Sequence, residues 1–206
     1  MLKVADNPVP RWPLDRSLAE DLGNWWVARV KPRTEKALAW ELYEKGIGYY
    51  LPMFTKRTIR RDNLKPRKSV ITLFPGYISL TNWPEKRESI LRTGRVLRVI
   101  RVIDQEKFVG ELDNIRKALE HAREVEIHPQ LAVGERVMII EGPMQGVEGV
   151  IARMQEPNKI YLNVEMFNRA VVVKVSPELL APVDDHLVIK TDANNKKEDC
   201  ADELHT

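Results

Sequence analysis

Cationic side chains are concentrated in one short segment of the sequence, 56–68. The segment holds seven lysine and arginine residues against a single acidic residue, Asp62. Guanidinium and ammonium groups bind phosphate oxygens, which gives an affinity that depends on salt and not on base sequence. We therefore predict that this segment contacts nucleic acid or another anionic surface; the alternative is a solvated loop. The cationic residues are Lys56, Arg57, Arg60, Arg61, Lys65, Arg67 and Lys68.

The charge of the whole chain is unevenly distributed. Residues 25–110 hold 19 Lys and Arg against 8 Asp and Glu, whereas residues 111–206 hold 11 against 18. The net charge of +3 therefore joins a basic half to an acidic half. Such an asymmetry indicates that one half faces nucleic acid and the other half faces a different partner.

Residue types that carry catalysis are scattered. The four histidines (His121, His128, His186 and His205) have no HExxH or Cys–His spacing, and Cys200 is alone. No glycine-rich phosphate-binding motif is present, so we predict no catalytic site, no metal and no cofactor. The chain also lacks a run of about 18 apolar residues and a secretory signal, which favours a cytoplasmic protein with no membrane contact.

The residue patterns predict an α+β protein. In the first half, strand-like runs alternate with segments of helical spacing, at 25–30, 47–54, 70–80 and 96–103 for strands and after Pro32, at 83–93 and at 105–123 for helices. After the segment 123–130, short strand patterns separated by turn residues predict a small β-barrel. We expect a leader at 1–24, a first domain at 25–122, a linker at 123–130, a barrel at 131–183 and a disordered polar tail at 184–206.

Two stretches resemble a known family. The sequences WWVARVKPRTEKALAWELYEKGIGYYLPM, LFPGYISL and TGRVLRVI resemble the N-terminal (NGN) domain of the NusG family of transcription elongation factors. The stretch LAVGERVMIIEGPMQGVEGVI resembles a KOW motif, with its glycines in the expected order. Together the resemblance covers residues 25 to about 183. It implies an antiparallel sheet flanked by helices, linked to an SH3-like KOW β-barrel.

The resemblance also implies a protein partner. Family members dock an apolar patch onto the clamp helices of the largest subunit of RNA polymerase. The matching residues are Phe74, Pro75, Gly76 and Tyr77, with Leu51, Pro52 and Met53 nearby. In an unbroken strand Phe74 and Tyr77 would face opposite sides, so one of them is expected to be structural and Phe74 is expected to be the contact. The alternative is that Phe74 belongs to the core.

Contacts to the non-template DNA strand are implied in the same way. They map to Lys31, Arg33, Thr93 and Arg95, together with Arg57, Arg60 and Arg61 of the basic segment. Where relatives often read T-R-G-V, this chain reads Thr93-Gly94-Arg95-Val96, which shifts the arginine by one position.

In the expected barrel, the loop Phe167-Asn168-Arg169 matches the loop that contacts the termination factor Rho or the ribosomal protein NusE. Phe167 is either an exposed partner anchor or a plug for the end of the barrel.

These features favour a monomeric regulator of transcription elongation that binds polymerase, suppresses pausing and controls termination. The long leader, the basic segment and the acidic tail favour a specialised, RfaH-like antiterminator. The alternatives are a housekeeping NusG that promotes Rho-dependent termination and a ribosomal or RNA-binding KOW protein.

Overall fold

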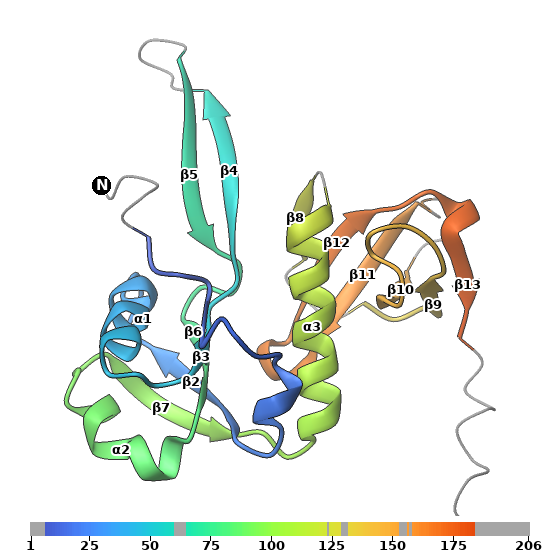
Figure 1. The fold of residues 1–206 in the computed structure, drawn as a ribbon. Coiled ribbons are helices and arrows are strands. Elements are labelled where there is room, and N and C mark those ends of the chain that lie inside the picture. The colour runs from blue at the N-terminus through green and yellow to red at the C-terminus, as the bar shows by residue number, and fades with distance from the viewer. Residues whose placement is uncertain are drawn as a thin grey trace, which may run out of the picture.

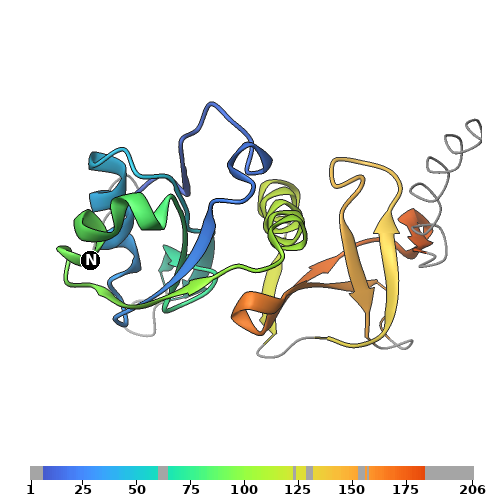
Figure 2. The ribbon, with the colours of Figure 1, turned by 90° about the horizontal axis from the view of Figure 1, so that it is seen from below.

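The structure, a computed structural model, describes residues 7–59, 65–122, 124–128, 132–152, 156 and 158–183. It contains two antiparallel sheets with helix α3 between them (Figures 1 and 2). A two-stranded ribbon projects beyond the first sheet (Figure 1). The chain is therefore α+β, as the sequence predicted.

The first sheet has the strand order β1-β3-β6-β2-β7. One face is covered by α1 and α2, which enclose a core of apolar side chains that includes Leu38, Leu42 and Ile90. The opposite face, which carries Trp25 and Val27, packs against α3. The elements are β1 (Arg11–Trp12), β2 (Trp25–Val30), α1 (Glu35–Glu44), β3 (Tyr49–Tyr50), β6 (Tyr77–Thr81), α2 (Trp83–Leu91), β7 (Val96–Arg101) and α3 (Gln105–His121).

Helix α3 begins where a side chain can satisfy its first free amide groups. The Asp104 carboxylate accepts a hydrogen bond from the Lys107 backbone N–H at 3.0 Å, which is an N-cap. Of the apolar stripe predicted from the sequence, Phe108, Leu112 and Ile115 are buried, whereas Leu119 is partly buried. At the start of the helix, the Gln105 side chain donates to the Trp25 carbonyl at 2.9 Å. These contacts fix α3 on the first sheet.

The stretch 70–80, predicted as one strand, is divided by a turn. Strand β5 (Pro66–Thr72) ends before Phe74, and β6 begins at Tyr77. Gly76 has φ +86°, a conformation that glycine adopts without strain, and the Tyr77 N–H donates to the Phe74 carbonyl at 3.2 Å. Because strand alternation does not continue through this turn, the prediction that Phe74 and Tyr77 face opposite sides was wrong.

The ribbon consists of β5 and its antiparallel partner β4 (Met53–Ile59). Its inner end is tied to both the helical layer and the leader. The Lys36 ammonium on α1 donates to the Val70 carbonyl and to the Asn7 side chain, both at 2.6 Å. Burial of Lys36 lowers its pKa from the ordinary lysine value.

The leader packs on the first domain along residues 7–24. Strand β1 pairs with β3, and Leu18, just before the short 3₁₀ helix η2 (Ala19–Asp21), is buried. The Leu18 carbonyl accepts a hydrogen bond from the Trp25 indole at 3.1 Å.

The second sheet has the order β13-β9-β10-β11-β12-β8. The expected closed barrel is corrected to an open sheet, since no described strand pairs β13 with β8. Strand β8 lies inside the expected linker, 123–130, and pairs with β12. The elements are β8 (Val125–His128), β9 (Glu135–Ile139), β10 (Glu148–Ile151), β11 (Lys159–Val164), η3 (Glu165–Phe167), β12 (Arg169–Lys174), η4 (Pro177–Leu179) and β13 (Leu180–Pro182).

Candidate functional site

An aromatic cluster joins the two sheets. The Phe167 ring lies 4.5 Å from that of Phe74, 5.4 Å from that of Tyr77 and 6.1 Å from that of Phe108, measured between centroids. Only 2% of Phe74 and 5% of Phe167 are exposed. The residue expected to bind polymerase and the residue expected to bind a second partner therefore cover each other.

Polar contacts from α3 surround this cluster. The Lys107 ammonium lies 2.6 Å from a Glu165 carboxylate oxygen. The Glu165 backbone N–H donates to the Glu111 carboxylate at 3.2 Å. Farther along the helix, the Asn114 amide pairs with the backbone of Glu148, donating to its carbonyl at 3.3 Å and accepting from its N–H at 3.4 Å.

The carboxyl group of Glu111, at this interface, has a shifted pKa. Burial raises its pKa to about 7, and the negative charge of Glu165 acts in the same direction, whereas the hydrogen bond from the Glu165 N–H opposes the shift. Near neutral pH, Glu111 therefore exchanges a proton with solvent while the two domains are packed together.

The remaining residues of the expected polymerase site lie in different surroundings. Pro75 is exposed beside Phe74, and the Gly76 N–H donates to the Glu35 carboxylate at 2.7 Å. Leu51 is 1% exposed and belongs to the core under α1 and α2. Pro52 is buried, and its carbonyl accepts a hydrogen bond from the Leu73 N–H at 2.8 Å. The structure thus brings Phe74 to Tyr77 together and sets Leu51 apart from them.

The residues expected to bind nucleic acid form two groups. In the first, the Lys31 backbone N–H donates to the Arg95 carbonyl at 2.9 Å, which places the start of α1 next to the start of β7. Arg33 is exposed there, whereas the Arg95 guanidinium pairs with Glu41 at 2.7 Å and the Thr93 hydroxyl donates to the Ile90 carbonyl.

The second group lies on the ribbon. Arg57 on β4 stands directly opposite Lys68 on β5. Arg60 and Arg61 lie outside the described residues.

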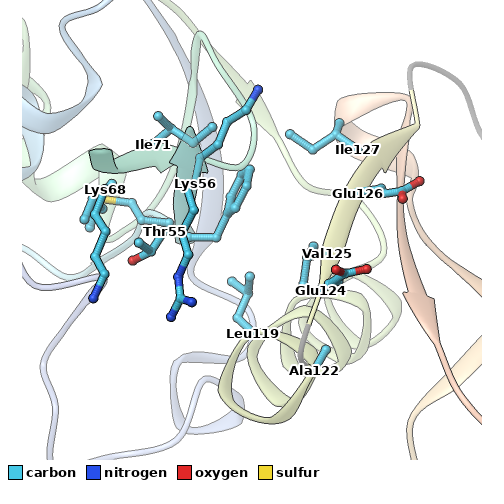
Figure 3. Close-up of a pocket in the computed structure, with 14 residues that line it drawn as sticks. Thr55, Lys56, Lys68, Ile71, Leu119, Ala122, Glu124, Val125, Glu126 and Ile127 are labelled. Atoms are coloured by element: carbon cyan, nitrogen blue, oxygen red, sulfur yellow. The ribbon is translucent and has the colours of Figure 1, made fainter. Parts of the chain in front are cut away.

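A groove of about 1350 Å³ separates the ribbon from α3 and β8 (Figure 3). Its ribbon side carries Lys56 and Ile71, and its other side carries Leu119, Val125 and Ile127. The groove combines apolar and charged side chains, with cations on the ribbon and glutamates on and before β8.

The loop between η3 and β12 has the conformation expected from its sequence. Asn168 has φ +50°, which asparagine tolerates better than most residues. The turn between β9 and β10 likewise uses Gly142 and Gly146 at positive φ.

Sequence reasoning missed Glu111 and a pair of arginines, Arg29 and Arg98. The arginines interrupt the apolar runs WWVARV and VLRVIRVI. Arg29 falls at a position where strand alternation predicts a side chain on the same face as Trp25 and Val27. A charged residue at a position that alternation assigns to the buried face could therefore have been noticed in the sequence. Glu111 has no such signal, because its burial depends on the second domain.

Within the described residues, no group of three His, Cys, Asp or Glu side chains is placed to hold a metal ion. The helices of that part of the chain are also too short or too polar to cross a membrane.

The structure combines one antiparallel sheet that has helices on both faces with a second antiparallel sheet that packs against α3 and the aromatic turn. Residues 23–115 match the family model described as transcription termination factor nusG. These residues are thus similar to the NusG family of transcription factors, and this match supports a role in transcription. A comparison with curated proteins gave no match.

Proposed function

We propose that this protein regulates transcription elongation by binding the clamp helices of the largest subunit of RNA polymerase through its first domain. The observation that carries the proposal is the family match over residues 23–115, which includes the turn Phe74 to Tyr77. An aromatic side chain at the border of a sheet suits a helix-binding hot spot.

Binding at this turn requires a change in the packing of the two domains. Phe74 lies beneath Phe167, so a polymerase helix reaches it only after Phe167 has moved away. The interface is held by a continuous apolar cluster that spans α3 and both sheets and includes these aromatic rings, together with polar contacts from α3, so opening must expose part of that cluster. We therefore propose that the closed arrangement is the free state and that the polymerase-bound state is open.

The two cationic groups are proposed to contact non-template DNA. On the ribbon, Arg57 and Lys68 are directly opposite each other, and like charges at such positions repel each other in the absence of an anion. A DNA phosphate bound between the two side chains would offset this electrostatic repulsion. Lys31, Arg33, Thr93 and Arg95 form the second contact, in which release of Arg95 from Glu41 accompanies binding.

The second domain is proposed to be a KOW-type module that contacts Rho or the ribosomal protein NusE through Phe167, Asn168 and Arg169. Because Phe167 also covers Phe74, opening would expose both partner surfaces at once. We propose that the net effect is reduced pausing and antitermination. The alternatives are termination through Rho and simple RNA binding.

The proposal is tested by in vitro transcription with bacterial polymerase on a template that carries a Rho-dependent terminator, with and without Rho. More read-through supports antitermination, and earlier termination in the presence of Rho supports the housekeeping role. Direct binding of the full chain to core polymerase is measured in parallel. A chain that binds RNA but does not bind polymerase would overturn the elongation-factor proposal.

A further inference from the structure

Arg29 and Arg98 form a cationic pair on the sheet face that α3 partly covers. Arg29 on β2 lies directly opposite Arg98 on β7. On its other side Arg29 lies opposite Tyr77 on β6. Three neighbouring strands thus present a row of side chains in the order Tyr77, Arg29, Arg98. Both arginines are exposed, although Trp25 and Val27 on the same face of β2 are buried.

No described residue neutralises this pair. No hydrogen bond or ion pair joins the guanidinium group of either arginine to the described part of the chain. Arg95, at the start of the same region, is by contrast held by Glu41. Directly opposed residues on antiparallel strands have Cβ atoms about 4.5–5.5 Å apart, at which like charges are destabilising. A pair that carries such a cost is suited to receive anionic groups from a partner.

The row adjoins the covered aromatic cluster. Tyr77 lies at one end of the row, and its ring is 5.4 Å from that of Phe167. Phe74, beneath Phe167, is almost fully buried, whereas the two arginines are already accessible. A partner can therefore reach the arginines before the domains separate and can reach Phe74 only afterwards.

We propose that Arg29 and Arg98 make the first contact with polymerase, by binding two carboxylates one turn apart on an acidic helix face. This inference rests on the proposed function. Side chains at positions i and i+4 of a helix are about 5–6 Å apart, which matches the spacing of the two arginines. Arginine also binds carboxylates through two parallel hydrogen bonds, so the pair fixes the orientation of the helix. The helix is then held beside Phe74 when Phe167 leaves.

This order of contacts predicts separate kinetic effects. Exposed charges at the rim of an interface accelerate association and make it sensitive to salt. Buried aromatic anchors mainly slow dissociation. Removing the arginines should therefore lower the association rate constant, whereas removing Phe74 should raise the dissociation rate constant.

The test measures association of the full chain with core RNA polymerase by stopped flow at low and high salt. The variant Arg29→Glu with Arg98→Glu is compared with Lys86→Glu with Arg87→Glu, which makes the same charge change on exposed positions of α2. We expect the arginine variant to associate at least about tenfold more slowly at low salt, with dissociation changed by less than about twofold. The variant Arg29→Lys with Arg98→Lys should retain most of the association rate. Circular dichroism confirms that each variant is folded.

Equal association rates for the two charge-reversed variants would overturn this inference, and the proposed function would stand if Phe74→Ala still accelerated dissociation. The inference would also fail if the arginine variant lost binding to a single-stranded DNA oligonucleotide and kept its association with polymerase, because the pair would then be a phosphate site. No binding of the unaltered chain to polymerase would overturn the proposed function itself.

Discussion

At the scale of single residues, Phe167 and Phe74 are each proposed to have two roles, packing in the closed form and partner binding in the open form, which cannot operate at the same time. The two rings contact each other within the same buried cluster, and each is proposed to bind a different partner once uncovered. A mutation at either position therefore changes two equilibria, the packing of the domains and the binding of a partner. The two effects can be separated by combining the mutations.

Phe167→Ala should strengthen polymerase binding, because it removes the side chain that covers Phe74. The affinity of the variant and of the unaltered chain for core polymerase is compared by titration. Thermal melting shows whether the second domain remains folded, and Phe167→Leu serves as a milder substitution if it does not. Unchanged affinity with a folded second domain would show that Phe167 does not limit access to Phe74.

Phe74→Ala, made in the Phe167→Ala background, should weaken polymerase binding by about 2 kcal/mol, or about 30-fold, the size of a hot-spot effect. The Phe167→Ala background is used because we expect its Phe74 to be uncovered already. The difference in affinity between the single and the double variant then reports polymerase binding alone. Leu91→Ala on α2, a residue that is 44% exposed, is the matched control. If both substitutions gave the same affinity, Phe74 would be a core residue only.

At the scale of elements, glycines shape the second sheet through close backbone approach. A Cβ at Gly134 would overlap the backbone carbonyl oxygen of Ile151, and a Cβ at Gly149 would overlap the side chain of Ile160. The positive φ of Gly142 and Gly146 gives the turn between them. These positions account for the glycine pattern of the KOW-like stretch by strand packing alone.

Gly134→Ala should destabilise the second domain, because a backbone oxygen cannot move aside as a flexible side chain would. Gly110→Ala is the opposite case, since Gly110 lies within α3 and its Cβ would meet nothing within 4 Å. We expect Gly110→Ala to stabilise the protein by about 0.5–1 kcal/mol, the helix propensity difference between the two residues. Denaturant unfolding of both variants measures the two effects, and destabilisation by both would contradict this account.

The positions of most elements could be predicted from the sequence because their apolar spacing is regular. The stripe on α3 and the strands β9 to β12 are examples. In the stretch 70–80, Pro75 and Gly76 predict a bulge or an edge within one strand, whereas the structure has a turn with Gly76 at positive φ that divides the stretch into two strands. Strand β8 was also missed, because the segment 123–130 has weak periodicity and contains a proline, whereas in the structure residues 125–128 pair with β12.

The sequence predicted the polymerase-binding turn and the partner-binding loop as two separate surfaces. It did not predict that these surfaces pack against each other. Phe74 and Phe167 were each assigned by resemblance to a different family motif, and 93 positions separate them in the chain. Leu51 was placed near Phe74 by the same resemblance, yet its side chain belongs to the opposite layer of the sheet. Tertiary packing decides such assignments.

At the scale of the whole molecule, closure of the two domains is coupled to pH through Glu111. Its pKa is about 7 in the closed form, whereas an exposed glutamate has a pKa near 4.5. The closed form therefore binds an extra proton between these values. The stabilisation of closure by protonated Glu111 is complete below about pH 4.5, is lost as pH rises to about 7 and does not change with pH above that value, where the ionised carboxylate disfavours closure by a constant amount.

Glu111→Gln should remove this pH dependence, because glutamine is neutral and its carbonyl can still accept the hydrogen bond from the Glu165 N–H. The amide chemical shifts of Asn168 and Gly76 report closure between pH 5 and 8. We expect them to change with pH in the unaltered chain and to stay constant in the variant. Glu106→Gln, on an exposed position of the same helix, is the control. Identical pH profiles for the unaltered chain and Glu111→Gln would refute the coupling.

The short connection between α3 and β8 has a consequence for any open state. The helix ends at His121 and the strand begins at Val125, so the two are joined by a tether that spans at most about 14 Å when extended. The second domain, held by so short a linker, remains at a high effective concentration near its docking surface and rebinds rapidly. A partner that opens the protein must therefore compete with a second sheet that stays tethered nearby, so the proposed binding of polymerase would be readily reversed when polymerase is released.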